Sequence, residues 1–268
     1  MTDLVSFLAT GPAVLVEVTK TLGSTPREQG ACMLVSANGI WGTIGGGQFE
    51  FLAIANARDL LRGAGVEVMD IPLGPEIGQC CGGRTELRFR VASPEIIEGL
   101  NLRMKGERDE WPDVYLFGAG HVGKSLALAL RPLPLKATVV ETRREELEGL
   151  PEDVETRHSA MPESLIAKLR PGSAIVVLTH DHALDFLIAR EALRRDDLAY
   201  VGMIGSATKR ATFASWLMRE GGEKSWLERL VLPIGGTAVP DKRPAVIAAM
   251  TTAEILAALT SHQKRSSP

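Results

Sequence analysis

No segment restricts the possible folds of this chain as strongly as the glycine-rich stretch GAGHVGKS at residues 118–125. It satisfies both the dinucleotide fingerprint G-x-G-x-x-G and the P-loop pattern G-x-x-x-x-G-K-[ST]. Each pattern joins a β-strand to an α-helix and turns backbone N–H groups toward a phosphate. The stretch therefore predicts an α/β domain with an anion site at the start of one helix.

The surroundings of this stretch favour the dinucleotide pattern. A Rossmann-type site needs an acidic residue about 20 residues further on, at the end of the second strand, where it binds a ribose hydroxyl. Glu141 ends a strand-like run, eighteen residues after Gly123. We therefore predict that Gly118, Gly120 and Gly123, with His121 among them, bind phosphate and that Glu141 binds ribose.

Two other interpretations of the stretch stay open. In a P-loop protein Lys124 would contact the β- and γ-phosphates, and an apolar strand would end in an aspartate that binds Mg²⁺. Asp181 is the candidate, but Thr179 and His180 separate it from the apolar run 175–178. The glycines can also serve only a tight turn and close helix packing, in a fold that has lost its nucleotide.

Alternating strands and helices after residue 112 predict a parallel sheet. Strand-like runs begin near residues 114, 137, 174, 199 and 230, and helical segments lie between them. Such alternation gives a parallel sheet with helices on both faces. We predict a C-terminal Rossmann-like domain at residues 113–260 and a frayed tail at residues 261–268.

The first hundred residues predict a smaller α+β domain. Asn38-Gly39 lies between two strand-like runs and predicts a hairpin, because both turn positions must accept a positive φ. Three glycines at residues 45–47 then open a helix that ends near residue 62. The charged segment KGERDEWP at residues 105–112 has a glycine near one end and a proline at the other, so we expect a linker there, after a domain of residues 1–104.

Composition excludes several classes of function. With 45% apolar and 24% charged residues in 268, the chain has the mix of a soluble globular protein. Its 5% aromatic content and net charge of −3 argue against a nucleic-acid partner, which needs stacking platforms or a basic face. The chain has three cysteines and no signal-peptide pattern, and its longest uncharged stretch, residues 31–49, contains five glycines. We therefore expect a cytoplasmic protein without a membrane span.

The loop GQCCGGR at residues 78–84 carries the most unusual side chains. Two adjacent thiols in a glycine-lined loop are expected to be exposed, and Arg84 is near enough in sequence to favour a thiolate. Thiolates are soft ligands for zinc, copper, iron–sulfur clusters or a related heavy metal, so Cys80 and Cys81 are the candidate metal ligands. Cys32, in contrast, lies in an apolar run and is expected in the core.

A histidine pair follows the predicted strand at residues 174–179. His180 and His182 are candidates for binding a metal or transferring a proton, while Asp181 between them is equally suited to cap the next helix. The sequence has no further histidine cluster, so we do not expect a catalytic metal there.

Two other glycine turns are candidate anion sites. Lys209 and Arg210 follow the turn at residues 202–206, and they could hold an anion or remain solvated. The three glycines at residues 45–47, followed by Glu50, could form an anion nest or only a turn.

Four of these segments together resemble the xanthine dehydrogenase accessory factor (XdhC/CoxI) family. They are, in chain order, residues 45–50, the paired-cysteine loop, residues 118–123 and residues 202–210. The resemblance extends from about Ala13 to Leu259, and the paired cysteines are its most specific part. The chain departs from the family at Gln48, where many relatives carry cysteine, and at residues 237–243, where relatives show an acidic, proline-led helix start.

The resemblance implies a carrier rather than a catalyst. Such proteins bind the molybdenum cofactor (molybdopterin), hold it while a cysteine desulfurase supplies the terminal sulfur, and help insert it into the molybdenum-binding subunit of xanthine dehydrogenase. Carried over to this chain, Gln79, Cys80 and Cys81 would hold the cofactor, and the glycines of residues 118–123 would hold a nucleotide or the pterin phosphate. We also expect a homodimer.

An alternative function of another class follows from the residues alone. A Rossmann-like domain suits an NAD(P)-dependent oxidoreductase, with His180 or His182 as the proton donor. NAD(P) is therefore the second candidate cofactor. A third hypothesis, a P-loop NTPase, depends on Lys124.

Overall fold

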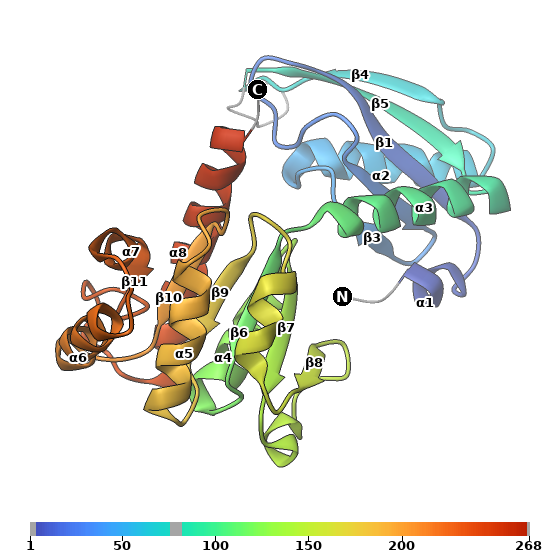
Figure 1. Ribbon diagram of the computed structural model, residues 1–268. Helices are drawn as coiled ribbons and strands as arrows, with labels where there is room; N and C mark the ends of the chain where they lie inside the picture. Colours follow the sequence, from blue (N-terminus) through green and yellow to red (C-terminus); the bar gives the residue numbers. More distant parts are fainter. Residues whose placement is uncertain (1–3, 76–81, 267–268) are drawn as a thin grey trace. The chain divides into compact units, whose positions relative to one another are not determined.

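The computed structural model describes residues 4–75 and 82–266 and divides the chain into two compact units, residues 1–104 and 105–268 (Figure 1). The boundary falls inside helix α3 (Pro94–Glu110), at the position where the sequence predicted that a linker begins. Residues 105–110 are instead the last turns of this helix. Lys, Glu and Arg favour helix, and Pro112 lies just beyond the end.

The N-terminal unit is built on a five-stranded antiparallel sheet in the order β3-β2-β1-β5-β4. Besides α3, its elements are α1 (Leu4–Leu8), β1 (Ala13–Leu22), β2 (Cys32–Ser36), β3 (Ile40–Gly42), α2 (Gly47–Leu61), β4 (Val68–Pro72) and β5 (Arg84–Val91). Strands β2 and β3 form the hairpin predicted at Asn38-Gly39, with Val35 opposite Ile40. The predicted α+β character of this unit is confirmed.

Both faces of this antiparallel sheet carry a core cluster. Successive side chains of β1 point to opposite faces. Val14, Val16 and Val18 join the cluster under α2, and Ala13 and Leu15 join the cluster under α1 and α3. The sheet is therefore packed by α2 on one face and by α1 and α3, from the two ends of the unit's sequence, on the other.

The C-terminal unit contains a six-stranded parallel sheet in the order β11-β10-β9-β6-β7-β8. Its elements are β6 (Asp113–Phe117), α4 (His121–Leu130), β7 (Lys136–Glu141), η2 (Arg144–Leu147), β8 (Glu155–His158), η3 (Pro162–Lys168), β9 (Ala174–Val177), α5 (His182–Leu193), β10 (Tyr200–Met203), α6 (Ala207–Arg219), α7 (Lys224–Arg229), β11 (Leu230–Val231) and α8 (Pro244–Ser266). This is the strand order of the Rossmann fold. The predicted fold class is confirmed.

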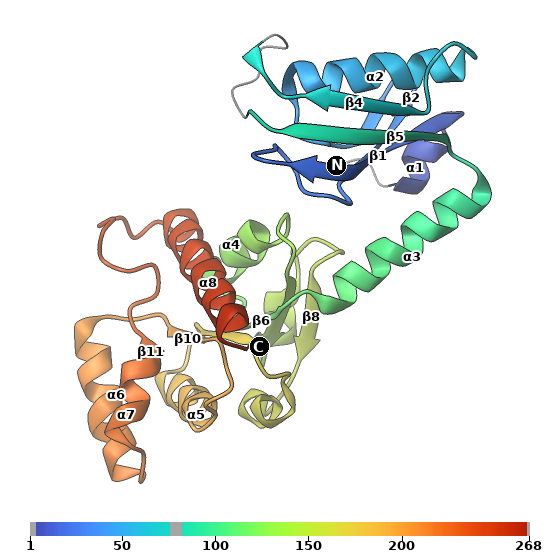
Figure 2. The same ribbon diagram turned by 90° about the horizontal axis from the view of Figure 1, so that it is seen from above.

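Helices cover both faces of the parallel sheet (Figure 2). Helices α4 and α8 lie together on one side, and α5, α6 and α7 lie on the other. Along β6, Val114 and Leu116 belong to the cluster with α4 and α8, and Phe117 belongs to the opposite cluster. The winding direction reverses between the neighbouring strands β6 and β9, so the loops after these two strands form the crevice where Rossmann folds bind ligands.

Three details of the C-terminal unit correct the sequence prediction. Residues 261–266 continue α8 instead of fraying, and the hydroxyl groups of Thr260 and Ser261 each donate to a carbonyl four residues earlier in the helix. The segment Pro162–Lys168 is a 3₁₀ helix rather than an α-helix. Strand β8 was missed because its four residues are all exposed and polar.

Among the described residues, one helix is long and apolar enough to cross a membrane by length and composition, namely α8 over Pro244–Arg265. Its Ala248, Thr251, Ile255 and Leu259 are buried, and the three apolar ones belong to the cluster with α4. Burial of one stripe at this spacing is the pattern of a helix packed on a protein core.

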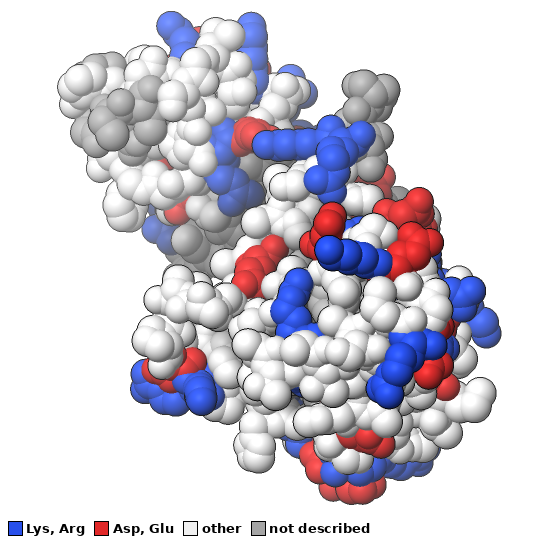
Figure 3. Space-filling model, turned by 60° about the vertical axis from the view of Figure 1, so that its left-hand side comes forward, with Lys and Arg blue, Asp and Glu red and all other residues white. Residues whose placement is uncertain are grey.

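Charged side chains of both signs are interspersed on the face of the molecule that Figure 3 shows. Several form exposed ion pairs, such as Arg131 with Asp153 at 2.6 Å. Exposed pairs of this kind contribute little to stability. Mixed signs also prevent an extended field of one sign on that face.

Candidate functional site

The predicted phosphate loop joins β6 to α4, and its three glycines have different roles. Gly118 has a φ of +125°, and a Cβ there would lie 2.2 Å from the carbonyl oxygen of Leu178. A Cβ on Gly123 would lie 2.1 Å from the carbonyl oxygen of Gly118. A Cβ on Gly120 would meet no atom within 4 Å. Gly118 and Gly123 are thus required by packing, whereas Gly120 borders open space.

The open space at Gly120 lies at the start of α4. Gly120 is the N-cap residue of this ten-residue helix, and it has no side chain to accept from the first N–H groups. The first turn contains no acidic residue, and His121, its first residue, is exposed. Unpaired N–H groups and the helix dipole favour an anion at such a position. The geometry therefore fits a phosphate directed at Gly120.

Glu141 lies at the carboxyl end of β7, as the fingerprint predicts, but its carboxylate points into the loop. The Ala119 N–H donates to Oε2 at 2.9 Å, and the Thr142 and Arg143 N–H groups donate to Oε1 at 2.8 and 3.1 Å. The Thr142 hydroxyl donates to Oε1 as well, at 3.0 Å. The side chain is 3% exposed.

The protonation of Glu141 follows from these contacts. Burial by itself would raise the pKa of Glu141, but the hydrogen bonds from Ala119, Arg143 and Thr142 outweigh burial and lower the pKa. The group is therefore ionised at neutral pH and holds the phosphate loop against the turn that follows β7.

The P-loop interpretation does not fit the geometry. Lys124 Nζ donates to the carbonyl oxygen of Glu148 at 3.0 Å, so this ammonium group is used in a contact with the loop after η2. Asp181 accepts a hydrogen bond from the Ala183 N–H at 2.8 Å and caps α5, which is the structural role considered for it. Neither residue has the role that a nucleoside triphosphatase would require.

The histidines that flank Asp181 are exposed, and the nearby buried charge is a different residue. Asp185 is fully buried, and it accepts from the Thr179 N–H at 2.9 Å and from Lys209 Nζ at 2.5 Å. This ion pair connects α5 to α6, and the contact with Thr179 also holds the loop after β9. Within residues 4–75 and 82–266, no three His, Cys, Asp or Glu side chains form a group able to hold a metal ion.

The basic residues at the start of α6 are structural. Lys209 donates both to Asp185 and to the carbonyl oxygen of Ile204, and its side chain is only 10% exposed. Arg210 donates to carbonyl oxygens around β11, including Leu230 at 3.0 Å and Leu227 at 2.9 Å. Neither of the two alternatives considered for these residues, anion binding or full solvation, is observed.

The triglycine turn before α2 does form an anion nest, and the chain itself supplies the anion. All three glycines have positive φ values, and Glu50 Oε2 accepts from the N–H groups of Ile44 and Gly46 at 3.0 and 3.2 Å. A Cβ on Gly45 would lie 2.4 Å from Cβ of Pro26, which fixes this turn against the loop after β1. The nest serves the fold of the N-terminal unit.

The candidate ligands Gln79, Cys80 and Cys81 lie outside the described residues, but the base of their loop is described. The Leu73 N–H donates to the Gly83 carbonyl at 2.8 Å, and the Gly82 N–H donates to the Leu73 carbonyl at 2.9 Å. A Cβ on Gly83 would lie 2.1 Å from the Ser24 carbonyl oxygen, so this position accepts only glycine. The two ends of the cysteine loop are therefore held firmly together.

The expectation for Cys32 needs correction, and the expectation that Arg84 favours a thiolate stays a prediction because Cys80 and Cys81 lie outside the described residues. Arg84 Nε donates to Asp70 at 2.6 Å, so this guanidinium pairs with the neighbouring strand β4. Cys32 is half-buried rather than fully in the core, and the Arg103 guanidinium donates to its Sγ at 2.9 Å. Arg103 also pairs with Glu17 at 2.7 Å. The spacing along the sequence gave no signal for either contact.

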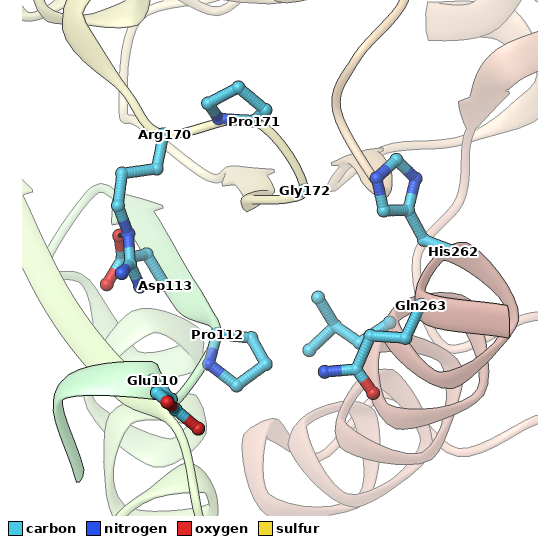
Figure 4. A pocket seen from close by; sticks show the side chains of 9 residues that line it. Glu110, Pro112, Asp113, Arg170, Pro171, Gly172, His262 and Gln263 are labelled. Carbon is cyan, nitrogen blue, oxygen red and sulfur yellow. Dashed lines mark hydrogen bonds and ion pairs between the residues drawn. The ribbon is translucent and has the colours of Figure 1, made fainter. Parts of the chain in front are cut away.

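A cavity of about 410 Å³ lies at the opposite edge of the parallel sheet, near the amino ends of β6 and β9 (Figure 4). Asp113, Arg170, His262 and Gln263 are among its lining residues. Arg170 pairs with Asp113 at 2.6 Å and donates to the Trp111 carbonyl oxygen, so its charge is already compensated. Rossmann folds bind ligands at the carboxyl ends of their strands, so the loop at Gly120, and not this cavity, is the candidate site.

Together these features define a two-unit protein with a Rossmann domain, and family comparisons agree. Residues 114–255 match the XdhC Rossmann domain, and residues 8–71 match the XdhC and CoxI family. The chain belongs to the XdhC family, and the predicted resemblance is confirmed.

Two known proteins illustrate the likeness. The uncharacterized protein YqeB of Escherichia coli K12 is 28% identical over 257 residues, which cover 91% of this chain. The chain spans only 43% of the length of YqeB. A crystal structure described as a xanthine dehydrogenase from Bacillus halodurans aligns with a TM-score of 0.76 over 98% of this chain and 96% of that one. With 17% sequence identity, this second likeness shows the fold.

Proposed function

We propose that this chain is a xanthine dehydrogenase maturation factor that binds the molybdenum cofactor through a phosphate group at Gly120. The observation that carries the proposal is the contrast between the three glycines, because only Gly120 borders open space at an uncapped helix start. A side chain at this position would fill the volume next to the first N–H groups of α4. The ligand that we propose is a phosphorylated pterin, which the resemblance to the XdhC/CoxI family implies.

The residues assigned to the cofactor fall into two groups. Gly118, Gly120, His121 and Gly123 would form the phosphate cradle, and Glu141 would hold its shape. Gln79, Cys80 and Cys81 would hold the metal end, because thiolates are soft ligands suited to a heavy metal. When bound, the cofactor would supply the molybdenum centre that the target dehydrogenase requires.

The proposed carrier would work with two partners. A cysteine desulfurase would add the terminal sulfur while the cofactor is held, and the molybdenum-binding subunit of xanthine dehydrogenase would receive it. We propose that the carrier acts as a homodimer in the cytoplasm. Free thiols such as those of Cys80 and Cys81 stay reduced in the cytoplasm. Release to a partner requires that binding be moderate in strength.

Elemental and pterin analysis of the purified protein tests this function. Wild type should carry molybdenum and pterin, and the double variant Cys80→Ala/Cys81→Ala should lose most of the molybdenum. Cys32→Ser is the matched control, because Cys32 is the third cysteine and contacts Arg103. A double variant with as much molybdenum as the wild type would refute the assignment of the two thiols.

The Rossmann strand order supports one alternative, an NAD(P)-dependent oxidoreductase. That function requires saturable binding of NAD or NADP, weakened by Glu141→Ala. Thermal unfolding with each nucleotide at millimolar concentration tests it, since ligand binding raises the unfolding temperature. No protection by either nucleotide would exclude this alternative.

A further inference from the structure

The carboxylate of Glu141 occupies the position at which Rossmann folds recognise a ribose, but it is buried and hydrogen-bonded within the loop. Three donors, namely the N–H groups of Thr142 and Arg143 and the Thr142 hydroxyl, converge on Oε1 at 2.8 to 3.1 Å, and the Ala119 N–H donates to Oε2 at 2.9 Å. The side chain is 3% exposed. A ribose 2′-hydroxyl would reach Oε2 only if the phosphate loop moved away from the carboxylate, and the Ala119 N–H would then lose its partner, which offsets any gain.

A phosphorylated ribose finds no better partner at this turn. Rossmann domains that take a 2′-phosphate use an arginine near the acidic position. Arg143 is placed for this role, but its guanidinium lies 3.7 Å from Glu141 and 3.2 Å from Glu146. Two carboxylates therefore compensate its charge. Exposed Arg144 is followed directly by Glu145, so the turn as a whole carries more negative than positive charge.

From these contacts we infer that the Rossmann domain of this chain selects its ligand by the phosphate alone and does not recognise a ribose, with Glu141 as a positioning residue of the loop. The inference rests on the proposed phosphate cradle at Gly120 and narrows its ligand class. The site binds a phosphate ester or pyrophosphate, and the residues at the end of β7 make no specific contact with the organic part of this ligand. A pterin phosphate belongs to this class of ligand. The nucleoside halves of NAD and NADP gain no binding free energy from contacts at the end of β7.

Calorimetric binding to the full-length protein tests the inference with four probes. Inorganic pyrophosphate measures the cradle itself, and ADP, 2′-deoxy-ADP and 2′-phospho-ADP differ only at the ribose position in question. The three nucleotides should bind with dissociation constants equal within about threefold, because a charge-assisted hydrogen bond to a free carboxylate would contribute roughly tenfold or more. Binding of ADP or 2′-phospho-ADP more than about threefold tighter than 2′-deoxy-ADP would overturn the inference and leave the cradle intact.

The variant Glu141→Gln separates positioning from recognition. The glutamine side chain has only one acceptor oxygen, so it cannot accept hydrogen bonds both from Ala119 and from residues 142–143. The loop should therefore lose its shape, and the affinity for pyrophosphate should fall about tenfold. The ratio of the dissociation constants of ADP and 2′-deoxy-ADP should stay near one. Glu145→Gln, the same change at an exposed site of the same turn, should bind all four probes as the wild type does. If wild type binds none of the four probes, the proposed cradle is wrong and the inference falls with it.

Discussion

The three loop glycines predict three different results of the same small perturbation, an added methyl group. Gly118→Ala and Gly123→Ala place a Cβ 2.2 and 2.1 Å from backbone carbonyl oxygens. Gly120→Ala places it in open space, at a φ of −69° and ψ of −174° that alanine adopts readily. The first two variants should lose stability, and the third should lose ligand binding instead.

The magnitudes follow from these distances. Overpacking against a neighbour that cannot move costs about 1–3 kcal/mol, and a non-glycine residue at positive φ adds about 1–3 kcal/mol. Gly118→Ala incurs both, so we expect a loss of about 3 kcal/mol or more. Gly123→Ala incurs only the clash and regains about 1 kcal/mol of helix propensity, which leaves a loss of up to about 2 kcal/mol. Gly120→Ala exchanges one N-cap residue for a poorer one and should lose less than about 1 kcal/mol.

Thermal unfolding and pyrophosphate calorimetry together distinguish the three variants. For a unit of 164 residues, each kcal/mol shifts the unfolding temperature by roughly 2–4 °C. Gly118→Ala should therefore unfold at least about 6 °C below the wild type, and Gly120→Ala within about 3 °C of it. Pyrophosphate affinity of Gly120→Ala should fall about tenfold or more, because the methyl group separates the phosphate from the helix N–H groups.

Two results would refute this reasoning. If Gly120→Ala binds pyrophosphate as tightly as the wild type, no phosphate approaches the helix start at this residue. If Gly118→Ala unfolds at the wild-type temperature, the packing of the loop against Leu178 is not as the structure has it.

Three further predictions concern other parts of the chain. Asp185→Asn leaves the Lys209 ammonium buried without its carboxylate partner and should cost about 3–5 kcal/mol in chemical denaturation, whereas Asp153→Asn at the exposed pair with Arg131 should cost less than about 1 kcal/mol. Because hydrogen bonds lower the pKa of Glu141 below its ordinary value of 4.5, its contribution to stability is complete at neutral pH and is lost as the pH falls below 4.5 and through the lowered pKa. Glu141→Gln should therefore flatten the dependence of stability on pH in this acidic range. Gly106→Ala, inside α3 with no atom near the added Cβ, should stabilise by about 0.5–1 kcal/mol in the same denaturation assay.

The sequence was sufficient for the fold because its signals there are local. A glycine fingerprint at the end of one strand, an acidic residue at the end of the next and regular alternation of strands and helices determine a Rossmann order. The extension of α3 through residue 110 was missed for a local reason too, since a glycine within charged residues was taken as a break. Gly106 is tolerated there because neighbouring residues favour helix.

The roles of charged side chains could not be predicted in the same way. Spacing placed Glu141 correctly at the end of β7, but the direction of its carboxylate depends on the path of the backbone at Thr142 and Arg143. The pair of Asp185 and Lys209 joins residues 24 positions apart on separate helices. Such contacts depend on tertiary packing, and one sequence contains no periodic signal for them.

The two glycine-rich helix starts of this chain illustrate why the ligand site belongs to one of them. In the N-terminal unit, Glu50 fills the nest formed by the triglycine turn, so its backbone donors are satisfied within the fold. In the Rossmann domain, Glu141 takes the Ala119 N–H but approaches from the β7 side, and Gly120 beyond it remains without a neighbouring atom. An external anion at the first turn would have to displace a carboxylate, whereas at the second it meets unpaired donors in a loop that Glu141 already holds in shape.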